Sequence, residues 1–248
     1  MNPPDIGPGT ALFLDIDGTL LEFAERPDEV LVPPDLAPML RNLSDALGGA
    51  LAVVSGRPIH SIDRLLRPFA SAAAGQHGAE WRGGAGAPVA APDPPAAMEQ
   101  LRARLGDLAA ALPDIFLEPK AYSVTIHYHG AGAGLESRLA ALVAELGGEW
   151  QLLPARQALE VKLPSYNKGI AIRRFLAVPP FRGRTPMFLG DDLTDEDGFA
   201  VVAEAGGCPV RVGPVERPSI AKARLTGPRE ARRWLAEQLA SLTRTSFE

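Results

Sequence analysis

Three short apolar segments, each ending at a polar turn, constrain the fold of this chain most strongly. They are residues 11–14, 51–54 and 186–189, and they are followed by Asp15, Ser55 and Gly190. Segments with helical spacing lie between them, at residues 36–47, 59–66 and 170–176. Strands that alternate with helices in this way form a parallel sheet covered by helices on both faces. We therefore expect an α/β fold.

A stretch rich in proline, glycine and alanine, residues 83–97, predicts a domain boundary. Beyond it we expect helices at residues 96–112 and 135–146, and strands near residues 115–120, 121–128, 149–153 and 158–163. This order predicts a small α+β domain, with its helices on one face of a sheet, inserted into the core. We expect the core to comprise residues 1–85 and 165–248 and the inserted domain residues 86–164.

Composition excludes several classes of partner. The chain has 248 residues, 46% of them hydrophobic, and 25 Lys and Arg against 30 Asp and Glu. This net charge of −5, without a basic run, argues against nucleic acid as a partner. No stretch approaches the roughly 20 apolar residues of a membrane helix, and the start does not resemble a signal peptide. We therefore expect a cytoplasmic protein with no membrane partner. The sequence does not fix the oligomeric state, for which a monomer is our expectation.

Two carboxylates follow the first apolar strand. Asp15 and Asp17 stand at positions i and i+2, so their side chains share one face of an extended chain. Gly18 allows a sharp turn that brings backbone N–H groups close to an anion. The single cysteine, Cys208, rules out an internal disulfide, and no Cys/His spacing resembles a zinc site. Oxygen must therefore hold any metal, and oxygen ligands at this spacing suit Mg²⁺. Taken alone, the motif is also compatible with an acidic turn that caps a helix.

Three further motifs occur at the ends of predicted elements. They are Ser55-Gly-Arg57, Lys168 at the start of a helix, and the acidic run from Asp191 to Asp197. In an open parallel sheet the carboxyl ends of the strands line one crevice, where ligands bind. There Ser55 can donate a hydrogen bond to a phosphoryl oxygen, Lys168 can pair with developing negative charge, and Asp191 can complete a metal site.

The order of these motifs, D-x-D-G-T, S-G-R, N-K-G and G-D-D-x-T-D, resembles the haloacid dehalogenase superfamily of phosphatases over essentially the whole chain. The resemblance implies a Rossmann-like core, an aspartyl-phosphate on Asp15, and Asp17 acting first as acid and then as base. It implies phosphoryl binding by Ser55 and Lys168. The implied Mg²⁺ ligands are Asp15, the Asp17 carbonyl and Asp191, with Asp192 and Asp195 as supporting candidates.

The inserted domain carries two acid–base pairs. Glu118 and Lys120, like Glu160 and Lys162, stand at i and i+2 on one face of a predicted strand. Carboxylates and ammonium groups together suit the hydroxyls of a neutral polyol. A cross-strand salt-bridge ladder on a solvated face is the competing explanation.

An insert of this kind resembles the large cap of sugar phosphatases in the same superfamily. The segment from Gly75 to Glu80 (GQHGAE), together with the acid–base pairs and His127-Tyr128, resembles the trehalose-6-phosphate phosphatase family. That resemblance implies a sugar phosphate, trehalose 6-phosphate, as the substrate. His129 departs from the arginine that this family often has after His-Tyr. The candidates for substrate binding are Gly18, Thr19, Arg57, His77, Glu118, Lys120, Glu160 and Lys162.

Two other readings remain open from the sequence. The core motifs are equally compatible with a capped phosphatase acting on sucrose phosphate, a mannosyl phosphate or sugar phosphates in general. A phospho-acceptor signalling module also combines an acidic Mg²⁺ pocket with a lysine. Such a module needs neither Asp17 nor an insertion, so we regard it as the weaker alternative.

Overall fold

The computed structural model describes residues 1–24, 29–112, 115–128, 134–147, 150–155, 158–214 and 218–245. His129 and the glycine-rich segment 130–133 lie outside these residues. The chain divides into two compact units, one formed by Met1–Ala91 with Asn167–Glu248 and the other by Pro92–Tyr166. The domain boundaries predicted from the sequence lie between residues 85 and 86 and between residues 164 and 165. Residues up to Ala91 stay with the first unit because Ala90 exchanges two backbone hydrogen bonds with Trp81.

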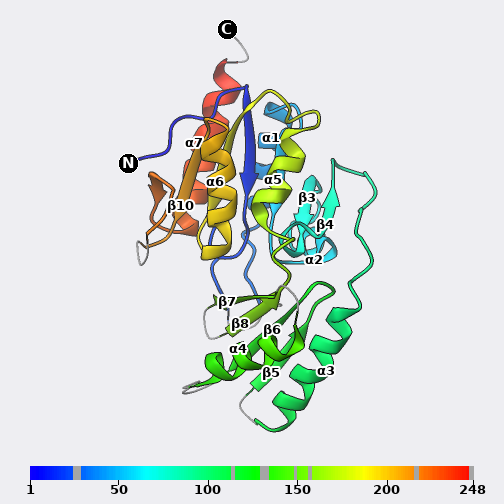
Figure 1. The fold of residues 1–248 in the computed structure, drawn as a ribbon. Helices are drawn as coiled ribbons and strands as arrows, with labels where there is room; N and C mark the ends of the chain where they lie inside the picture. The colour runs from blue at the N-terminus through cyan, green and yellow to red at the C-terminus, as the bar shows by residue number, and fades with distance from the viewer. Residues whose placement is uncertain are drawn as a thin grey trace. The chain divides into compact units, whose positions relative to one another are not determined.

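A seven-stranded sheet forms the centre of the first unit (Figure 1). Its pairs are parallel except for the last, which is antiparallel. This confirms the predicted α/β class. The strand order is β11 (Ala223–Leu225), β10 (Cys208–Val212), β9 (Thr185–Gly190), β1 (Thr10–Leu14), β2 (Leu51–Val54), β3 (Ala72–Gly75) and β4 (Glu80–Arg82).

Helices pack around this sheet in two groups (Figure 1). Helix α5 (Lys168–Leu176) packs against α6 (Glu196–Glu204), and α1 (Leu36–Ala46) packs against α7 (Pro228–Thr245). Helix α2 (Ile59–Leu65) follows β2, and two short 3-10 turns, η1 (Gln76–Gly78) and η2 (Leu193–Asp195), follow β3 and β9. The strand order turns in opposite directions on either side of β1, which is the topological switch point where α/β sheets bind ligands.

Buried aromatic rings lock α5 onto the sheet. The Phe13 ring on β1 lies 5.5 Å from that of Phe181 and 5.9 Å from that of Phe175 on α5. All three side chains are fully buried. Rings at these separations add attraction beyond the apolar area they remove from water. Packing of these rings, which involves the last turn of α5, therefore fixes this helix against β1.

The second unit is a four-stranded antiparallel sheet with two helices. The strand order is β5 (Ile115–Pro119), β6 (Ser123–Tyr128), β8 (Ala158–Lys162) and β7 (Gln151–Ala155). Apolar residues of α3 (Ala97–Ala110) and α4 (Leu135–Leu146) form one core with Val124, Ile126 and Val161. Side chains alternate along a strand, so the opposite sheet face carries residues 123, 125, 127, 160 and 162.

Two strand boundaries differ from the prediction for physical reasons. Strand β7 runs on through Pro154 because it is an edge strand, where a missing N–H group is tolerated. Strand β6 starts at Ser123 rather than at 121, since the Lys120 N–H donates to the Ser123 carbonyl and closes a tight turn.

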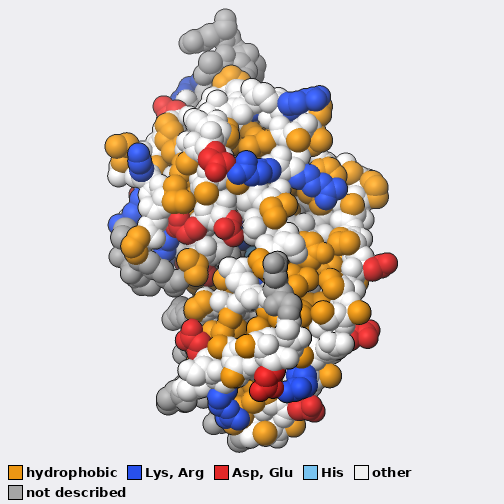
Figure 2. Space-filling model, viewed as in Figure 1, with side chains coloured by type: hydrophobic (Ala, Val, Ile, Leu, Met, Phe, Trp, Pro, Cys, Tyr) orange, Lys and Arg blue, Asp and Glu red, His pale blue; other side chains and the backbone are white. Residues whose placement is uncertain are grey.

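On the face drawn in Figure 2, acidic and basic side chains are interspersed with apolar ones. None of the helices within the described residues is long and apolar enough to cross a membrane.

Replacing Phe175 with Ala should lower the free energy of unfolding of the first unit by about 3–5 kcal/mol, because it leaves a cavity among buried rings. Phe23→Ala is the matched control, since Phe23 is 53% exposed and should contribute about 0.5 kcal/mol or less. Urea denaturation followed by circular dichroism would test this. Equal losses in the two variants would contradict the assigned core.

Candidate active site

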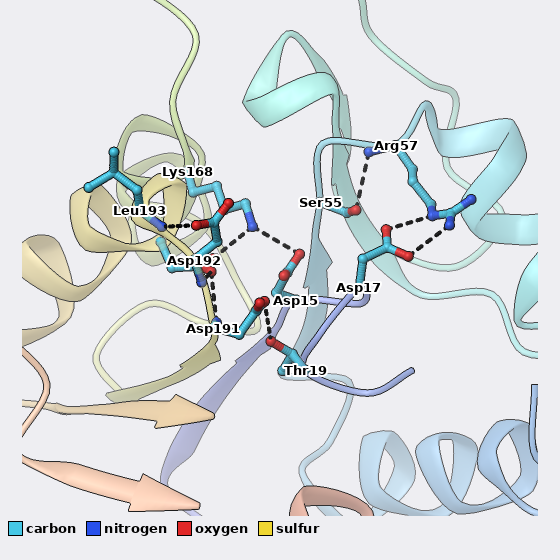
Figure 3. Close-up of polar contacts among 10 residues, drawn as sticks. Asp15, Asp17, Thr19, Ser55, Arg57, Lys168, Asp191, Asp192 and Leu193 are labelled. Carbon is cyan, nitrogen blue, oxygen red and sulfur yellow. Dashed lines mark hydrogen bonds and ion pairs between the residues drawn. The ribbon is translucent and has the colours of Figure 1, made fainter. Parts of the chain in front are cut away.

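The adjacent strands β9, β1 and β2 end side by side, and each is followed by a polar residue. These are Asp191, Asp15 and Ser55, which the register of the parallel pairs brings to one edge of the sheet (Figure 3). The sequence predicted this convergence from the positions of the motifs alone. Leu14 pairs with Leu189 on β9 and with Val53 on β2, so Asp191 and Ser55 each lie only one residue beyond the level of Asp15.

The Lys168 ammonium lies between two carboxylates in this cluster. Its Nζ is 2.9 Å from Asp15 Oδ1 and 2.7 Å from Asp195 Oδ1, and the side chain is 3% exposed (Figure 3). Burial alone would lower the pKa of Lys168, but the two carboxylates outweigh it and raise the pKa above its usual value. Lys168 is therefore a permanent positive charge beside Asp15.

The residues on either side of Lys168 explain its position. Asn167 caps α5, accepting a hydrogen bond from the Ile170 N–H at 2.9 Å, so that Lys168 is the first helical residue. Gly169 allows α5 to approach α6 closely, because a Cβ atom there would lie 2.5 Å from the Asp197 carbonyl oxygen. The N-K-G motif thus contains a cap, a functional charge and a packing contact.

Asp15, Asp191 and Asp195 form a cluster that fits a divalent cation. Each offers a carboxylate oxygen within 4.8 Å of the others. Burial, together with the neighbouring carboxylates, raises the pKa of Asp15 to about 7 and that of Asp191 to about 9, although Lys168 opposes both shifts. Buried acids that repel one another in this way are stabilised by a hard cation, and their oxygens are the ligands that Mg²⁺ prefers.

Asp195 and Asp192 have different surroundings, although the sequence treated them alike. Asp195 Oδ2 accepts hydrogen bonds from the N–H groups of Asp191 and Asp192, each at 2.9 Å, and so fixes the loop after β9. Asp192 lies outside the acidic cluster, and its Oδ1 caps η2 by accepting from the Leu193 N–H at 2.7 Å. Of the two supporting metal candidates, the structure brings only Asp195 to the cluster.

The loop after β1 meets the loop after β9. Thr19 Oγ1 donates a hydrogen bond to Asp191 Oδ1 at 3.2 Å. Gly18 has a φ of 77°, and a Cβ atom there would lie 2.1 Å from Asp191 Oδ2. Only glycine combines this conformation with so close an approach. Gly18 and Thr19 thus hold Asp191 against the end of β1.

Asp17 and Arg57 form a bidentate ion pair (Figure 3). Arg57 donates to both carboxylate oxygens at 2.7 Å, and its own N–H donates to Ser55 Oγ at 3.1 Å. Asp17 therefore points away from the cluster formed by Asp15, Asp191 and Asp195. Sequence reasoning assigned Arg57 to the substrate and missed this pair, because nothing in the sequence relates residues 40 positions apart in two loops.

The Ser55–Arg57 loop is held by a strained turn at η1. Gln76 and His77 adopt positive φ angles of 47° and 59°, and their N–H groups donate to the carbonyl oxygens of Arg57 and Ser55 at 3.0 Å. Glu80 accepts from the Ile59 N–H at 2.6 Å and from Gln76 Nε2. The segment GQHGAE, residues 75–80, therefore supports the Ser55–Arg57 loop. Strained backbone of this kind collects at functional sites.

His77 packs against the same loop. A Cβ atom at Gly56 would lie 2.9 Å from Cε1 and Nε2 of the His77 imidazole. His77, proposed from the sequence as a substrate contact, is 6% exposed and supports the loop that carries Ser55 and Arg57.

The four candidates in the second unit share the polar face of its sheet. Lys120 Nζ lies 3.8 Å from Glu118 and 3.9 Å from Glu160, while Lys162 Nζ donates to the Tyr166 carbonyl oxygen. His127 Nε2 is 2.9 Å from Glu118 Oε2. Burial would raise the pKa of Glu118, but the hydrogen bond from His127 and the charge of Lys120 outweigh it and hold the pKa below its usual value.

Sequence reasoning missed two hydroxyls on this face. Ser123 Oγ donates to Glu160 Oε1 at 2.7 Å, and Thr125 stands opposite both Glu118 and Glu160. The alternation of side chains along β6 was the available signal, since Ser123, Thr125 and His127 occupy every second position.

The chain matches a known protein family. The model of the family "Trehalose-phosphatase" matches residues 13–229. The chain is 41% identical over 207 residues to a probable trehalose-phosphate phosphatase of Sinorhizobium fredii, covering 82% of this chain and 78% of that protein. It is 38% identical over 212 residues to trehalose-6-phosphate phosphatase of Escherichia coli, covering 85% of this chain and 80% of that protein.

Solved structures share the fold at lower identity. The C-terminal domain of Candida albicans trehalose-6-phosphate phosphatase superposes with a TM-score of 0.81 at 21% identity, over 93% of this chain and 92% of that one. A haloacid dehalogenase-like hydrolase from Bacteroides thetaiotaomicron gives 0.64 at 15% identity, over 93% and 98%. The family match spans both the acidic cluster and the polar sheet face. The chain therefore belongs to the trehalose-phosphatase family, and it shares the fold of a haloacid dehalogenase-like hydrolase.

Proposed function

We propose that this protein is a Mg²⁺-dependent phosphomonoesterase that hydrolyses trehalose 6-phosphate through an aspartyl-phosphate on Asp15. One observation carries the mechanism: Asp15 is a buried carboxylate held beside the permanent charge of Lys168, at the strand end where two more acids converge. Membership of the trehalose-phosphatase family supports the substrate.

Asp15 acts as the nucleophile in this scheme. One of its carboxylate oxygens attacks phosphorus, the bond from phosphorus to the sugar oxygen breaks, and Asp17 gives that oxygen a proton. Asp17 then takes a proton from water, whose oxygen attacks phosphorus and releases Asp15. Arg57 donates one hydrogen bond to each Asp17 oxygen, and each oxygen keeps a second lone pair that can carry the transferred proton.

The surrounding groups bind and orient the phosphoryl group. Ser55 and Lys168 contribute a hydroxyl and an ammonium group, Gly18 and Thr19 supply the loop after β1, and Arg57 lies at the rim. His77 acts indirectly, by supporting the loop that carries Ser55 and Arg57. Preorganised donors of this kind stabilise charge that develops during phosphoryl transfer.

Asp15, the Asp17 carbonyl and Asp191 would hold Mg²⁺, with Asp195 supporting them through the loop after β9. The bound cation would neutralise the repulsion between the nucleophile and the phosphate.

The second unit is proposed as the cap that selects the substrate. Glu118, Lys120, Glu160 and Lys162 are assigned to the sugar, because ionised acceptors and donors on one face match the hydroxyls of a polyol. The two ion pairs of Lys120, to Glu118 at 3.8 Å and to Glu160 at 3.9 Å, are longer than hydrogen bonds, so the Lys120 ammonium can still donate to a ligand.

The substrate assignment predicts preferential phosphate release from trehalose 6-phosphate over sucrose 6-phosphate, glucose 6-phosphate and p-nitrophenyl phosphate. Glu118→Gln and Glu160→Gln should each lower kcat/KM for trehalose 6-phosphate by about 10- to 100-fold, the usual effect of losing a hydrogen bond to a charged group. Both should affect the aryl phosphate much less. Equal losses on the two substrates, or an even activity over the whole panel, would refute the role of the polar face.

The metal assignment predicts a dependence of stability on pH. The pKa of Asp191 is raised from 3.8 to about 9, so without metal the folded state binds a proton that the unfolded state lacks between these values. The melting temperature of the metal-free protein should therefore fall as pH rises from about 4 to about 9, and Asp191→Asn should reduce this fall.

Mg²⁺ at pH 8 should raise the melting temperature of the wild type and much less that of Asp191→Asn. Differential scanning fluorimetry with EDTA or Mg²⁺ would measure both effects. An unchanged pH dependence in the variant, together with an equal response to Mg²⁺, would count against this metal site.

A further inference from the structure

Thr125 lies at the centre of the polar sheet face in the second unit. It is on β6, and the register places it opposite Glu118 of β5 on one side and Glu160 of β8 on the other. Directly opposed residues of antiparallel strands have Cβ atoms about 5 Å apart. The hydroxyl thus lies in a row between two carboxylates.

This hydroxyl is buried without a partner. Thr125 is 6% exposed, and its Oγ1 has no hydrogen-bond partner among the residues that the structure describes. The neighbouring Ser123, by contrast, donates to Glu160 at 2.7 Å. A buried hydroxyl that makes no hydrogen bond destabilises the fold, and valine would fill the same space without that cost. Thr125 Oγ1 therefore does not stabilise the fold, which indicates that it binds a ligand.

The hydrogen-bonding groups of Glu118, Thr125 and Glu160 indicate which kind of ligand can bind between them. Carboxylates accept hydrogen bonds, whereas a threonine hydroxyl both donates and accepts. A pyranose presents neighbouring hydroxyls that are likewise donors and acceptors, so one sugar hydroxyl can bond to Thr125 while the next bonds to Glu118 or Glu160.

A sugar reaches Thr125 only when a flanking side chain moves. Glu118 is 32% exposed, and its contacts to His127 at 2.9 Å and Lys120 at 3.8 Å can be replaced by sugar hydroxyls. The opposite face of β6 is closed by the apolar core with α3 and α4, so the ligand must come from the polar side.

We propose that Thr125 Oγ1 hydrogen-bonds a sugar hydroxyl of the substrate and is a specificity-determining residue. This inference rests on the proposed function and deepens it. It adds the neutral hydroxyl of Thr125, which both donates and accepts, to the four charged side chains already assigned to the sugar.

The test compares Thr125→Val, which removes the hydroxyl and keeps the shape, with Thr125→Ser, which keeps the hydroxyl. The readout is kcat/KM for trehalose 6-phosphate divided by kcat/KM for p-nitrophenyl phosphate. Thr125→Val should lower this ratio by about 3- to 10-fold, as expected for one neutral hydrogen bond, and Thr125→Ser should stay near the wild type. Ser137→Ala, an exposed hydroxyl on α4 of the same unit, is the control and should leave the ratio unchanged.

A second measurement separates binding from fold stability. Inhibition of p-nitrophenyl phosphate hydrolysis by trehalose should weaken by the same factor in Thr125→Val, while the melting temperature should hold or rise. An unchanged ratio and unchanged inhibition would overturn the proposal. So would a lower melting temperature in Thr125→Val, because it would show that the hydroxyl bonds within the fold.

The substrate preference of the wild type separates failure of the proposed function from failure of the inference on Thr125. If it shows no preference for trehalose 6-phosphate, the proposed function fails and the Thr125 inference fails with it. If the wild type shows the preference and Thr125→Val retains it, only the inference on Thr125 fails.

Discussion

The buried ammonium of Lys168 between Asp15 and Asp195 is the contact on which the site depends. It joins the end of β1, the start of α5 and the turn after β9, three segments far apart in the sequence. Two carboxylates so deeply buried repel each other, and a fixed positive charge between them offsets much of that cost. The Asn167 cap, the close packing at Gly169 and the rings around Phe175 all serve to place this one nitrogen.

Several features lower the stability of the folded protein, and they lie at the sites proposed for phosphoryl transfer and sugar binding. Asp15 and Asp191 have raised pKa values, Gln76 and His77 have strained backbone, and Thr125 is a buried hydroxyl without a partner among the described residues. Proteins retain such costs where function requires them. The first two groups belong to the unit assigned to phosphoryl transfer and the third to the unit assigned to sugar recognition.

Much of the fold could be predicted from the sequence because its signals are local. Apolar runs ending in Asp15, Ser55 and Gly190 predict parallel strands, and the parallel register then brings the motifs together. Contacts between loops could not be predicted in this way. Loop conformation determines the Asp17–Arg57 ion pair and the hydrogen bonds of Glu80 that support the Ser55–Arg57 loop. Strand register determines the position of Thr125 between two glutamates. The sequence also could not separate the roles of Asp192 and Asp195, which stand three residues apart. Asp192 caps a turn, whereas Asp195 forms an ion pair with Lys168.

The central claim is that Asp15 carries the phosphoryl group during turnover. Rapid acid quenching of the enzyme in the presence of Mg²⁺ and trehalose 6-phosphate, followed by peptide mass spectrometry, tests it most directly. We expect one added phosphoryl group on the peptide that contains Asp15 and its absence in Asp15→Asn. It should accumulate in Asp17→Asn when p-nitrophenyl phosphate is the substrate, because that leaving group needs no proton from Asp17 whereas hydrolysis of the intermediate does need Asp17 as base. A phosphoryl group on another residue, or turnover retained in Asp15→Asn, would contradict the account.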